Sequence, residues 1–523
     1  MTTSNLFTAA SLLDTAAARF GAATAVRDGE GELSFEELQD AAARTATALR
    51  AAGVERGDRV GICMAKSVDQ AVAILGVLLA DAIVVPVLPK LKAEGIRHIV
   101  HDAGLRLMIT DAVRAAEITA SGADVPLIHG RHRDDAGAGP DLPALRRLAE
   151  PAAPGRSIGS DIAAVIYSSG STGRPKGIMV SHRNIWDGAR ITSRYLGTSR
   201  GDRIGSLLSL NFDYGLNQLW QTLATGASLH LHELVFPADA FRFLHEERIT
   251  VLPVMPVIIT RLFDPRLLRR RPEQDLSAVR YVSSSGGALS RRMTDDLAAT
   301  FPEARVFQMY GLTEAFRSTY LEPDQLEKRP GSIGRAIPDV EILVLDDELR
   351  EVGPGERGEL VHRGGCVSLG YWNAPEATAA RFRTLPQFPG ERVVFSGDVV
   401  TRDEEGYLYF VGRRDAMIKT SGFRVSPTEV EEIAARFPGI EACAALGVPN
   451  IGIGADIALV YSVVGPVDVV EFQRFLKENL PSHMVPRHLW EEPALPSTGN
   501  DGKIDRQALA ASVADRVAAA AQD

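Results

Sequence analysis

One stretch limits what this chain can fold into more than any other: residues 167–177, with the sequence YSSGSTGRPKG. An apolar run, residues 162–166, precedes it and predicts a buried strand. The stretch itself predicts a loop at the end of that strand, because clustered glycines and serines interrupt regular structure. Its glycines let backbone N–H groups approach an anion, its hydroxyls add donors, and Lys176 adds positive charge. These properties suit a polyphosphate.

Two better-known nucleotide motifs do not account for this chain. A Walker A loop needs a glycine directly before its lysine, and here Pro175 precedes Lys176. The dinucleotide spacing GxGxxG occurs at residues 353–358, but it leads into a short strand and not a helix, so it predicts a turn. The alternative for the Gly/Ser loop is an ordinary surface loop, and motifs farther along the chain decide between the two.

Strands alternate with helices in the first part of the chain, which predicts parallel sheet built from βα units. Short strands are predicted at residues 59–63, 83–87 and 105–109. Ser34, with Glu37 three residues later, predicts the start of a helix, because a serine at that position caps the free N–H groups of the first turn.

From residue 331 the pattern changes to short strands separated by Gly/Pro turns, which predicts a β-rich subdomain at about residues 331–411. A smaller set of strands and helices follows, and it is large enough for a core of its own. The predicted fold class is therefore α/β: a large N-terminal domain of βα-layered sheets with a β-rich subdomain, and a small α+β C-terminal domain.

Composition excludes several classes of protein. The net charge of -10 argues against a nucleic-acid-binding protein. Three widely spaced cysteines without a CxxC argue against a disulfide framework, which fits a reducing cytoplasm. No signal peptide is recognised at the N-terminus. The most apolar stretch, residues 71–88, is interrupted by Asp81 and Pro86, which predicts no membrane span. The sequence predicts a cytoplasmic protein.

Further motifs follow the loop. In chain order they are YGLTEA at 310–315, SGD at 396–398, GRRDAMIKTSGFRVSPTEVEE at 412–432, LPSHMVP at 480–486 and GKIDR at 502–506. Together with the loop, and in this order, they resemble the core motifs of the adenylate-forming superfamily. That superfamily includes acyl-CoA ligases, adenylation domains of peptide synthetases, and luciferases. The resemblance covers nearly the whole chain.

The resemblance implies an N-terminal adenylation core at residues 1–413, a mobile C-terminal domain at residues 414–523 and a hinge at Asp415. It also implies a two-step reaction. A carboxylate attacks the α-phosphate of ATP to give an acyl-adenylate and pyrophosphate, and a thiol then takes the acyl group. The cofactors implied are ATP, Mg²⁺ and CoA.

The catalytic residues implied are Lys503, Thr313 and Glu314. Lys503 matches the lysine that bridges the carboxylate and the α-phosphate, although Asp501 makes its motif one residue longer than the usual NGK. Thr313 resembles a contact to the α-phosphate, and Glu314 resembles the magnesium ligand. One carboxylate suffices for Mg²⁺, because the ion also binds the phosphates.

The resemblance assigns the nucleotide to residues from several motifs. Tyr310 is expected to stack on adenine, Asp398 to accept from both ribose hydroxyls, and Arg413 to donate to them. The full set expected to bind ATP or AMP is Ser168, Ser169, Gly170, Ser171, Thr172, Gly173, Lys176, Gly286, Gly287, Ala288, Tyr310, Gly311, Thr313, Asp398 and Arg413.

The acyl group and the thiol are assigned to two other segments. The segment FDYGLNQLW is expected to line the acyl pocket, with the candidates Phe212, Asp213, Tyr214, Asn217 and Ser285. Asp213 stands where amino-acid-activating relatives keep an acid for the substrate amine. A structural aspartate is the favoured alternative, because the residues after it do not follow that pattern. A passage for CoA is assigned to Ser421, Gly422 and Phe423.

The leading interpretation is an AMP-forming acyl-CoA ligase that acts on a small carboxylic acid. Its nearest rival is a free-standing adenylation enzyme that loads an acid onto a separate carrier protein. A third possibility is a non-catalytic protein that binds ATP or an acyl-adenylate, and Lys503, Glu314 and Lys176 argue against it. The sequence leaves the identity of the acid open.

Overall fold

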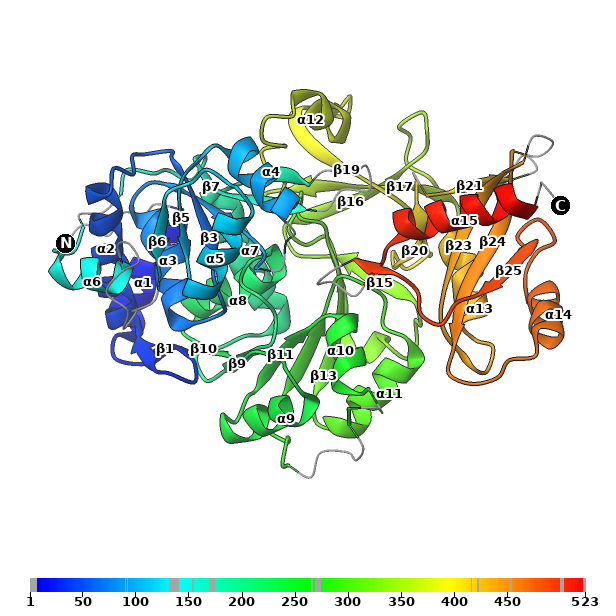
Figure 1. The fold of residues 1–523 in the computed structure, drawn as a ribbon, viewed down its shortest axis with the longest axis horizontal. Helices are drawn as coiled ribbons and strands as arrows, with labels where there is room; N and C mark the ends of the chain where they lie inside the picture. The colour runs from blue at the N-terminus through cyan, green and yellow to red at the C-terminus, as the bar shows by residue number, and fades with distance from the viewer. Residues whose placement is uncertain are drawn as a thin grey trace. The chain divides into compact units, whose positions relative to one another are not determined.

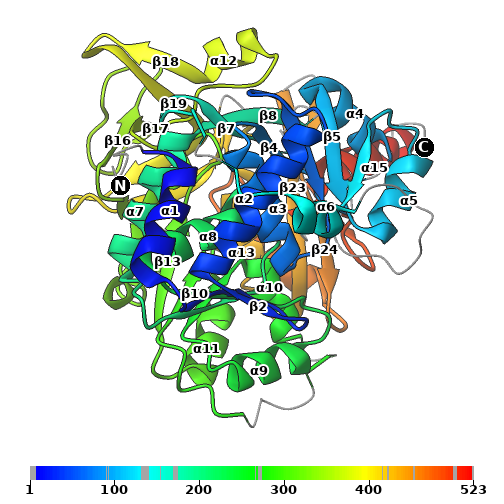
Figure 2. The same cartoon turned by 90° about the vertical axis from the view of Figure 1, so that its left-hand side faces the viewer.

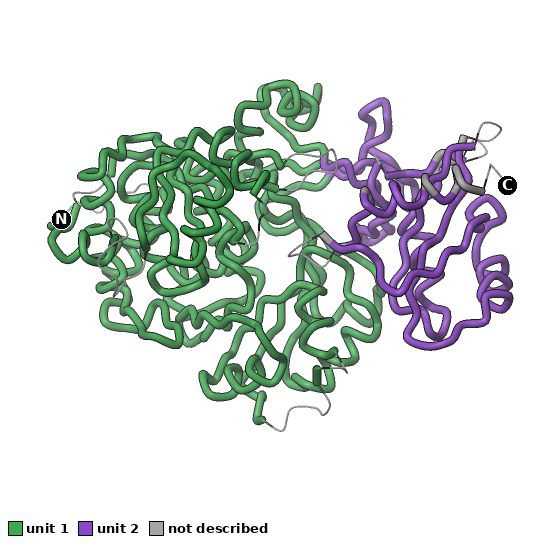
Figure 3. The backbone as a smooth tube through the Cα atoms, viewed as in Figure 1, with its two compact units in different colours: residues 1–342, 361–395 green, residues 343–360, 396–523 purple. Residues whose placement is uncertain are grey.

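The computed structural model describes residues 7–89, 91, 93–130, 141–152, 155–168, 175–264, 267–268, 274–414, 416–420, 423–450, 454–498 and 503–520 (Figure 1). The chain divides into two compact units (Figure 3). Unit 1 comprises residues 1–342 and 361–395, and unit 2 comprises residues 343–360 and 396–523. Unit 2 thus holds the predicted C-terminal domain together with strands that precede it. The predicted hinge, Asp415, lies outside the described residues.

Unit 1 contains a sheet of mostly parallel strands in the order β6-β5-β3-β4-β7-β8. Only β8 runs antiparallel, against β7. The strands are β3 (Arg59–Cys63), β4 (Ile83–Pro86), β5 (Leu105–Thr110), β6 (Leu127–His129), β7 (Ile162–Ser168) and β8 (Lys176–Ser181). In chain order, the helices before β7 that follow β2 (Glu32–Ser34) are α2 (Phe35–Ala51), α3 (Val68–Leu79), α4 (Ala93–Ala103), α5 (Ala112–Ala120) and α6 (Leu142–Leu148).

A second run of strands in unit 1 is part of a larger, 14-stranded sheet and has the order β15-β14-β13-β12-β11-β9-β10-β1-β2, parallel from β13 to β1. Its strands are β1 (Thr24–Arg27), β2 (Glu32–Ser34), β9 (Arg203–Ser206), β10 (Ser228–Leu231), β11 (Val251–Val254), β12 (Tyr281–Ser284), β13 (Arg305–Tyr310), β14 (Thr319–Leu321) and β15 (Ser332–Ala336). The remaining helices of this part of the chain are α1 (Ala9–Phe20), α7 (His182–Leu196), α8 (Asp213–Thr225), α9 (Pro237–Glu246), α10 (Pro256–Leu262) and α11 (Arg291–Thr300).

One apolar core joins the two sheets of unit 1. It contains buried side chains from α1, α2, α3 and α8 and from strands of both sheets, and Figure 2 shows these helices gathered together. A second core lies where α9, α10 and α11 pack on β11 and β12. The site segments between the sheets and their helices therefore stand on rigid, buried supports.

Unit 2 has a core of its own around α13 (Pro427–Ala434), α14 (Val469–Asn479) and the sheet β23-β24-β25. The strands of that sheet are β23 (Ile440–Asn450), β24 (Gly454–Val463) and β25 (His488–Glu491). Its other elements are β20 (Leu408–Arg413), β21 (Ile418–Thr420), β22 (Phe423–Val425), β26 (Ser497–Thr498), β27 (Lys503–Ile504) and α15 (Arg506–Ala520). Both units contribute residues to β16 (Val340–Leu345), β17 (Arg357–Gly364) and β19 (Phe388–Arg402), while β18 (Phe382–Leu385) and α12 (Pro375–Arg381) belong to unit 1.

The predicted fold class and several local predictions are confirmed. Ser34 caps α2 and exchanges hydrogen bonds with Glu37, as the capping pattern predicts. The strands predicted at residues 59–63, 83–87 and 105–109 correspond to β3, β4 and β5. No helix among the described residues is long and apolar enough to cross a membrane.

The start of α8 depends on a close backbone approach at Gly215. A Cβ atom there would lie 1.6 Å from the backbone oxygen of Ser209. Any side chain at residue 215 would therefore push α8 away from the preceding loop, and Asp213 at the first position of α8 would move with it.

We expect Gly215→Ala to lower the free energy of unfolding by about 1–3 kcal/mol, the usual cost of forcing an extra methyl group into a packed site. Urea denaturation monitored by fluorescence measures it. Gly29→Ala is the matched control, because no atom lies within 4 Å of a Cβ at exposed Gly29. Equal stability of the two variants would contradict the assigned packing.

Candidate active site

The predicted phosphate loop connects two paired strands. Ser168 at the end of β7 pairs with Lys176 at the start of β8. The predicted contacts Ser169, Gly170, Ser171, Thr172 and Gly173 lie outside the described residues. Next to the loop, the hydroxyl of Tyr167 donates to the Asp102 carboxylate at 2.5 Å. Burial and this contact raise the pKa of Tyr167, so its hydroxyl stays protonated.

Tyr371 links this loop to Glu314. The Tyr371 hydroxyl donates to Glu314 Oε1 at 2.6 Å, and Lys176 Nζ lies 5.6 Å from the centre of the Tyr371 ring. Burial, followed by the charge of Glu314, raises the pKa of Tyr371. The Tyr371 hydroxyl is therefore a fixed donor at neutral pH, and it orients the carboxylate that the sequence predicts to bind magnesium.

The backbone of Glu314 is held as firmly as its side chain. The Ser368 N–H donates to the Glu314 carbonyl at 2.8 Å. Beyond Ser368 the chain runs beside β8, where Leu369 N donates to Met179 O at 2.9 Å and Met179 N to Gly370 O at 2.9 Å. Residues 368–372 thus tie the Glu314 turn to the edge of the first sheet.

Glu314 suits a magnesium site in which phosphate oxygens supply further ligands of the ion. Within the described residues, no group of three His, Cys, Asp or Glu side chains is placed to hold a metal. A single half-buried carboxylate is the donor set expected where an ion takes its other ligands from phosphate and water. The predicted role of Glu314 is consistent with its chemistry.

The turn between β13 and β14 carries Thr313 and Glu314, and its backbone is tight. A Cβ atom at Gly311 would lie 2.8 Å from the Phe316 carbonyl oxygen, so only glycine fits there. Phe316 has φ of 60°, in the left-handed region. A bulky residue in this conformation costs about 1–3 kcal/mol, and such strain gathers at functional sites. Ser318 N closes the turn by donating to Tyr310 O at 3.0 Å.

The same turn brings three polar groups together. The Thr313 hydroxyl donates to Asp213 Oδ2 at 3.4 Å. Arg317 Nη1 lies 3.8 Å from the same carboxylate oxygen. Asp213 also accepts from the N–H of Tyr214 at 2.7 Å. The long Thr313 contact is weak, so its hydroxyl retains capacity to donate elsewhere.

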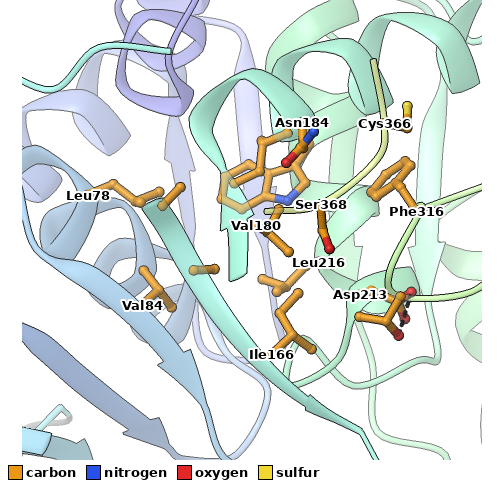
Figure 4. Close-up of a pocket in the computed structure, with 15 residues that line it drawn as sticks. Leu78, Val84, Ile166, Val180, Asn184, Asp213, Leu216, Phe316, Cys366 and Ser368 are labelled. Atoms are coloured by element: carbon orange, nitrogen blue, oxygen red, sulfur yellow. Dashed lines mark hydrogen bonds between the residues drawn. The ribbon is translucent and has the colours of Figure 1, made fainter. Parts of the chain in front are cut away.

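Asp213 and Thr313 both line a narrow apolar cavity of about 20 Å³, and Figure 4 shows Asp213 among the residues around it. Its walls include Ile166, Leu216 and Phe316. The other predicted acyl-pocket residues, Phe212, Tyr214, Asn217 and Ser285, do not line it.

The remaining acyl-pocket residues lie in or next to α8 and β12. Tyr214 is buried, and its hydroxyl contacts both the carbonyl and the side chain of Ser283 at 2.8 and 2.9 Å. Asn217 is buried against Thr192. Phe212 is half-buried, and Ser285 is buried at the end of β12. The structure thus brings Tyr214 to the strand that leads to Ser285.

The glycines after β12 are exposed, as a ligand-facing turn requires. Gly286 has φ of 85°, which favours glycine, and a Cβ atom there would lie 2.8 Å from Met255 Cε. A Cβ at Gly287 would lie 3.1 Å from Pro256 Cγ. Gly286, Gly287 and Ala288 all belong to the predicted nucleotide contacts.

The segment before α8 is fixed by residues that sequence reasoning missed. Lys66 is buried, and its Nζ donates to the carbonyls of Ser206 and Leu208 at 2.8 and 3.2 Å. Burial lowers the pKa of Lys66 to about 8. Gln70 Nε2 donates to Asn211 Oδ1 at 3.0 Å. These contacts hold the chain that leads into Asp213.

Unit 2 carries the other predicted residues. Asp398 and Arg413 are paired across β19 and β20, with Arg413 Nη1 3.1 Å from Asp398 Oδ1. Lys503 begins β27, and nearby Arg506 Nη2 grips both carboxylate oxygens of Glu431 at 2.7 and 2.8 Å. Phe423 begins β22.

Ser421 and Gly422, which were assigned to a CoA passage, lie outside the described residues. Their predicted role stays a prediction.

Tyr371 and Arg317 belong to the site but were not found by sequence reasoning. Tyr371 lies 57 residues from Glu314 along the chain, so no local pattern connects them. Arg317 follows the YGLTEA motif by two residues, and an arginine next to that turn was the available signal.

Comparison with known proteins identifies the family of this chain. Residues 13–372 match the family described as AMP-binding enzyme. Phosphinothricin tripeptide synthetase PhsC of Streptomyces viridochromogenes is 34% identical over 512 residues, which cover 95% of this chain and 44% of that protein. Surfactin synthase subunit 2 of Bacillus subtilis is 30% identical over 496 residues, covering 93% of this chain and 13% of that protein. The chain spans less than half the length of these relatives.

Solved structures match over almost the whole chain. The anthranilate CoA ligase AuaEII in complex with anthranoyl-AMP is 25% identical with a TM-score of 0.87, covering 99% of this chain and 100% of that one. A benzoate CoA ligase from Burkholderia xenovorans LB400 is 29% identical with a TM-score of 0.83, covering 96% and 99%. ATP-bound MatB from Rhodopseudomonas palustris is 26% identical with a TM-score of 0.85, covering 97% and 99%.

The fold and the family match together define an adenylate-forming enzyme. The chain belongs to the AMP-binding enzyme family, within the adenylate-forming superfamily. The predicted resemblance is confirmed.

We expect Tyr371→Phe to raise the Mg²⁺ concentration needed for half-maximal adenylate formation about tenfold. Losing a residue that orients a metal ligand typically costs 10–100-fold in metal affinity or activity. Pyrophosphate release at a series of Mg²⁺ concentrations measures it. Tyr281→Phe is the control, since it also removes a buried hydroxyl, one that contacts Thr198 at 2.8 Å. An unchanged magnesium dependence in Tyr371→Phe would refute the role of Tyr371.

Proposed function

We propose that this protein activates a carboxylic acid with ATP and transfers the acyl group to CoA, which makes it an AMP-forming acyl-CoA ligase. The observation that carries the proposal is the end-to-end likeness to CoA ligases: the anthranilate enzyme covers 99% of this chain, and this chain covers 100% of it.

The first step is assigned to residues that the sequence motifs predict. A carboxylate oxygen of the acid attacks the α-phosphorus of ATP, and pyrophosphate leaves with the bonding electron pair. The Thr313 hydroxyl donates to the α-phosphate, and Lys503 offsets the negative charge that grows as the acid and phosphate join. Glu314, held by Tyr371, would bind Mg²⁺, which supplies positive charge to the phosphate oxygens.

The nucleotide is assigned to the glycine turn at residues 286–287, to Tyr310, and to the Asp398–Arg413 pair. Asp398 is 7% exposed and Arg413 Nη1 lies 3.1 Å from its carboxylate, and we expect this carboxylate to accept from the ribose hydroxyls. In the second step a thiolate attacks the acyl carbonyl, and AMP leaves with the oxygen that had joined the acid to phosphorus.

A carrier protein is the alternative acceptor, and a specific observation favours it. The curated relatives that are at least 30% identical include a tripeptide synthetase and a surfactin synthase subunit. Both acceptors present a thiol, so the adenylation step is the same in the two cases.

We expect Lys503→Ala to slow adenylate formation at least 100-fold, because removing one preorganised donor to a developing oxyanion costs about 3 kcal/mol of barrier. ATP–pyrophosphate exchange with the best acid measures it. Lys477→Ala, at an exposed position of α14, is the matched control and should retain full exchange. Full exchange by Lys503→Ala would remove Lys503 from the mechanism.

We expect Gly422→Leu to spare adenylate formation and to block thioester formation, because a leucine side chain would fill the assigned passage for pantetheine. Mass spectrometry of the thioester, with CoA and then with a pantetheinylated carrier protein as acceptor, measures the second step. The wild-type result also decides between the acceptors: CoA thioester supports the ligase, and carrier thioester alone supports the alternative. Equal loss of both steps in the variant would contradict the assignment.

A further inference from the structure

Arg317 is a buried cation whose donors are not all used. Its side chain is 3% exposed, and Nη1 donates to the Phe316 carbonyl at 2.7 Å. Nε and Nη2 are buried and have no hydrogen-bond partner among the described residues. An arginine keeps its charge at any physiological pH. Unpaired buried donors on a charged group are costly, so these two N–H groups call for an acceptor that the described residues do not provide.

The described groups around Arg317 do not accept a hydrogen bond from its Nε or Nη2. Asp213 Oδ2 lies 3.8 Å from Nη1, which is beyond hydrogen-bond distance and on the edge of the guanidinium that Phe316 already occupies. The guanidinium carbon lies 4.5 Å from the centre of the Tyr214 ring and 5.5 Å from that of Phe316. The rings attract the cation but accept no ordinary hydrogen bond from Nε or Nη2.

The two unused groups point to a particular kind of acceptor. Nε–H and Nη2–H lie on one edge of the planar guanidinium and are parallel, so they match the two oxygens of one carboxylate. This chain uses the same edge elsewhere: Arg363 donates from Nε and Nη2 to the two oxygens of Glu391 at 2.7 and 2.9 Å. Within the part of the chain that the structure describes, no group accepts from this edge of Arg317, so it can bind a carboxylate.

The location ties this edge to the acid-binding region. Arg317 follows the turn that carries Thr313, the predicted contact to the α-phosphate. Asp213, which faces Arg317, lines the apolar cavity together with Thr313 (Figure 4). The left-handed backbone of Phe316 directly precedes Arg317, so the strained part of the turn is the part that sets the direction of this side chain.

We propose that Arg317 binds a second carboxylate on the acid substrate, at the end remote from the carboxylate that is activated. The preferred substrates are then dicarboxylic acids, including those with an amino group. An ammonium group next to Asp213 would offset the repulsion between that residue and the second carboxylate. This inference rests on the proposed function, since it names the class of acid that the same site activates.

The test compares matched acids with the wild-type enzyme in a pyrophosphate-release assay without an acceptor. Each dicarboxylic acid of three to six carbons, with and without an amino group, is paired with its analogue in which the second carboxylate is a primary amide. We expect at least one dicarboxylic acid to exceed its amide in kcat/KM by 100-fold or more. Equal kcat/KM within every pair overturns the inference and means that water satisfies Arg317.

Two variants test whether Arg317 causes the preference for dicarboxylic acids. Arg317→Lys keeps the charge but not the two parallel donors, and it should lower kcat/KM for the preferred dicarboxylic acid at least tenfold, mainly through KM, with little change for the amide. Arg317→Met should abolish the preference. Arg363→Met, which removes a carboxylate-binding arginine of unit 1, is the control and should keep it. A preference that survives both Arg317 variants also overturns the inference.

The outcomes separate this inference from the function it builds on. Activation of monocarboxylic acids or amides but of no dicarboxylic acid refutes the role of Arg317 and leaves the proposed ligase intact. If no acid of either kind leads to release of pyrophosphate, the result counts against both the role of Arg317 and the proposed ligase. Thermal denaturation of each variant shows whether a loss of activity reflects unfolding, and the wild-type comparison stands whatever the variants do.

Discussion

The closed turn between β13 and β14 is the constraint on which the candidate site depends. Gly311 leaves room for the carbonyl of Phe316 at a distance that no side chain would allow, and Phe316 takes a left-handed backbone to complete the turn. The result is that neighbouring residues face different partners. Thr313 faces Asp213, and Glu314 faces Tyr371. A looser turn would give up the alignment of all these groups at once.

The residues that contact this turn, Tyr371 and Asp213, lie in segments that are fixed by different contacts. Tyr371 is held because residues 369–370 bond to the backbone of β8. Asp213 is held because buried Lys66 fixes the chain before α8 and because Gly215 lets the helix approach Ser209. Preorganised donors cost no rearrangement when charge develops at the reacting phosphate, and this is the main physical advantage of such a site.

Local patterns in the sequence were enough to predict the parts that local chemistry determines. Ser34 caps its helix through atoms three residues away, and β7 is an apolar run whose burial needs no further information. The YGLTEA motif located Thr313 and Glu314. Contacts between distant segments were not predictable: Thr313 and Asp213 are 100 residues apart, and Tyr371 meets Glu314 only because residues 368–372 add to the edge of β8.

The central chemical claim is that an oxygen of the acid becomes bonded to the α-phosphorus of ATP. Isotope transfer tests it most directly. The enzyme is incubated with ATP, an acceptor thiol and an activated acid that carries ¹⁸O in both carboxylate oxygens, and the AMP is examined by mass spectrometry. The account predicts one ¹⁸O atom in each AMP molecule, because that oxygen leaves with phosphorus when the thioester forms. Unlabelled AMP, or ¹⁸O in the released pyrophosphate, would contradict it.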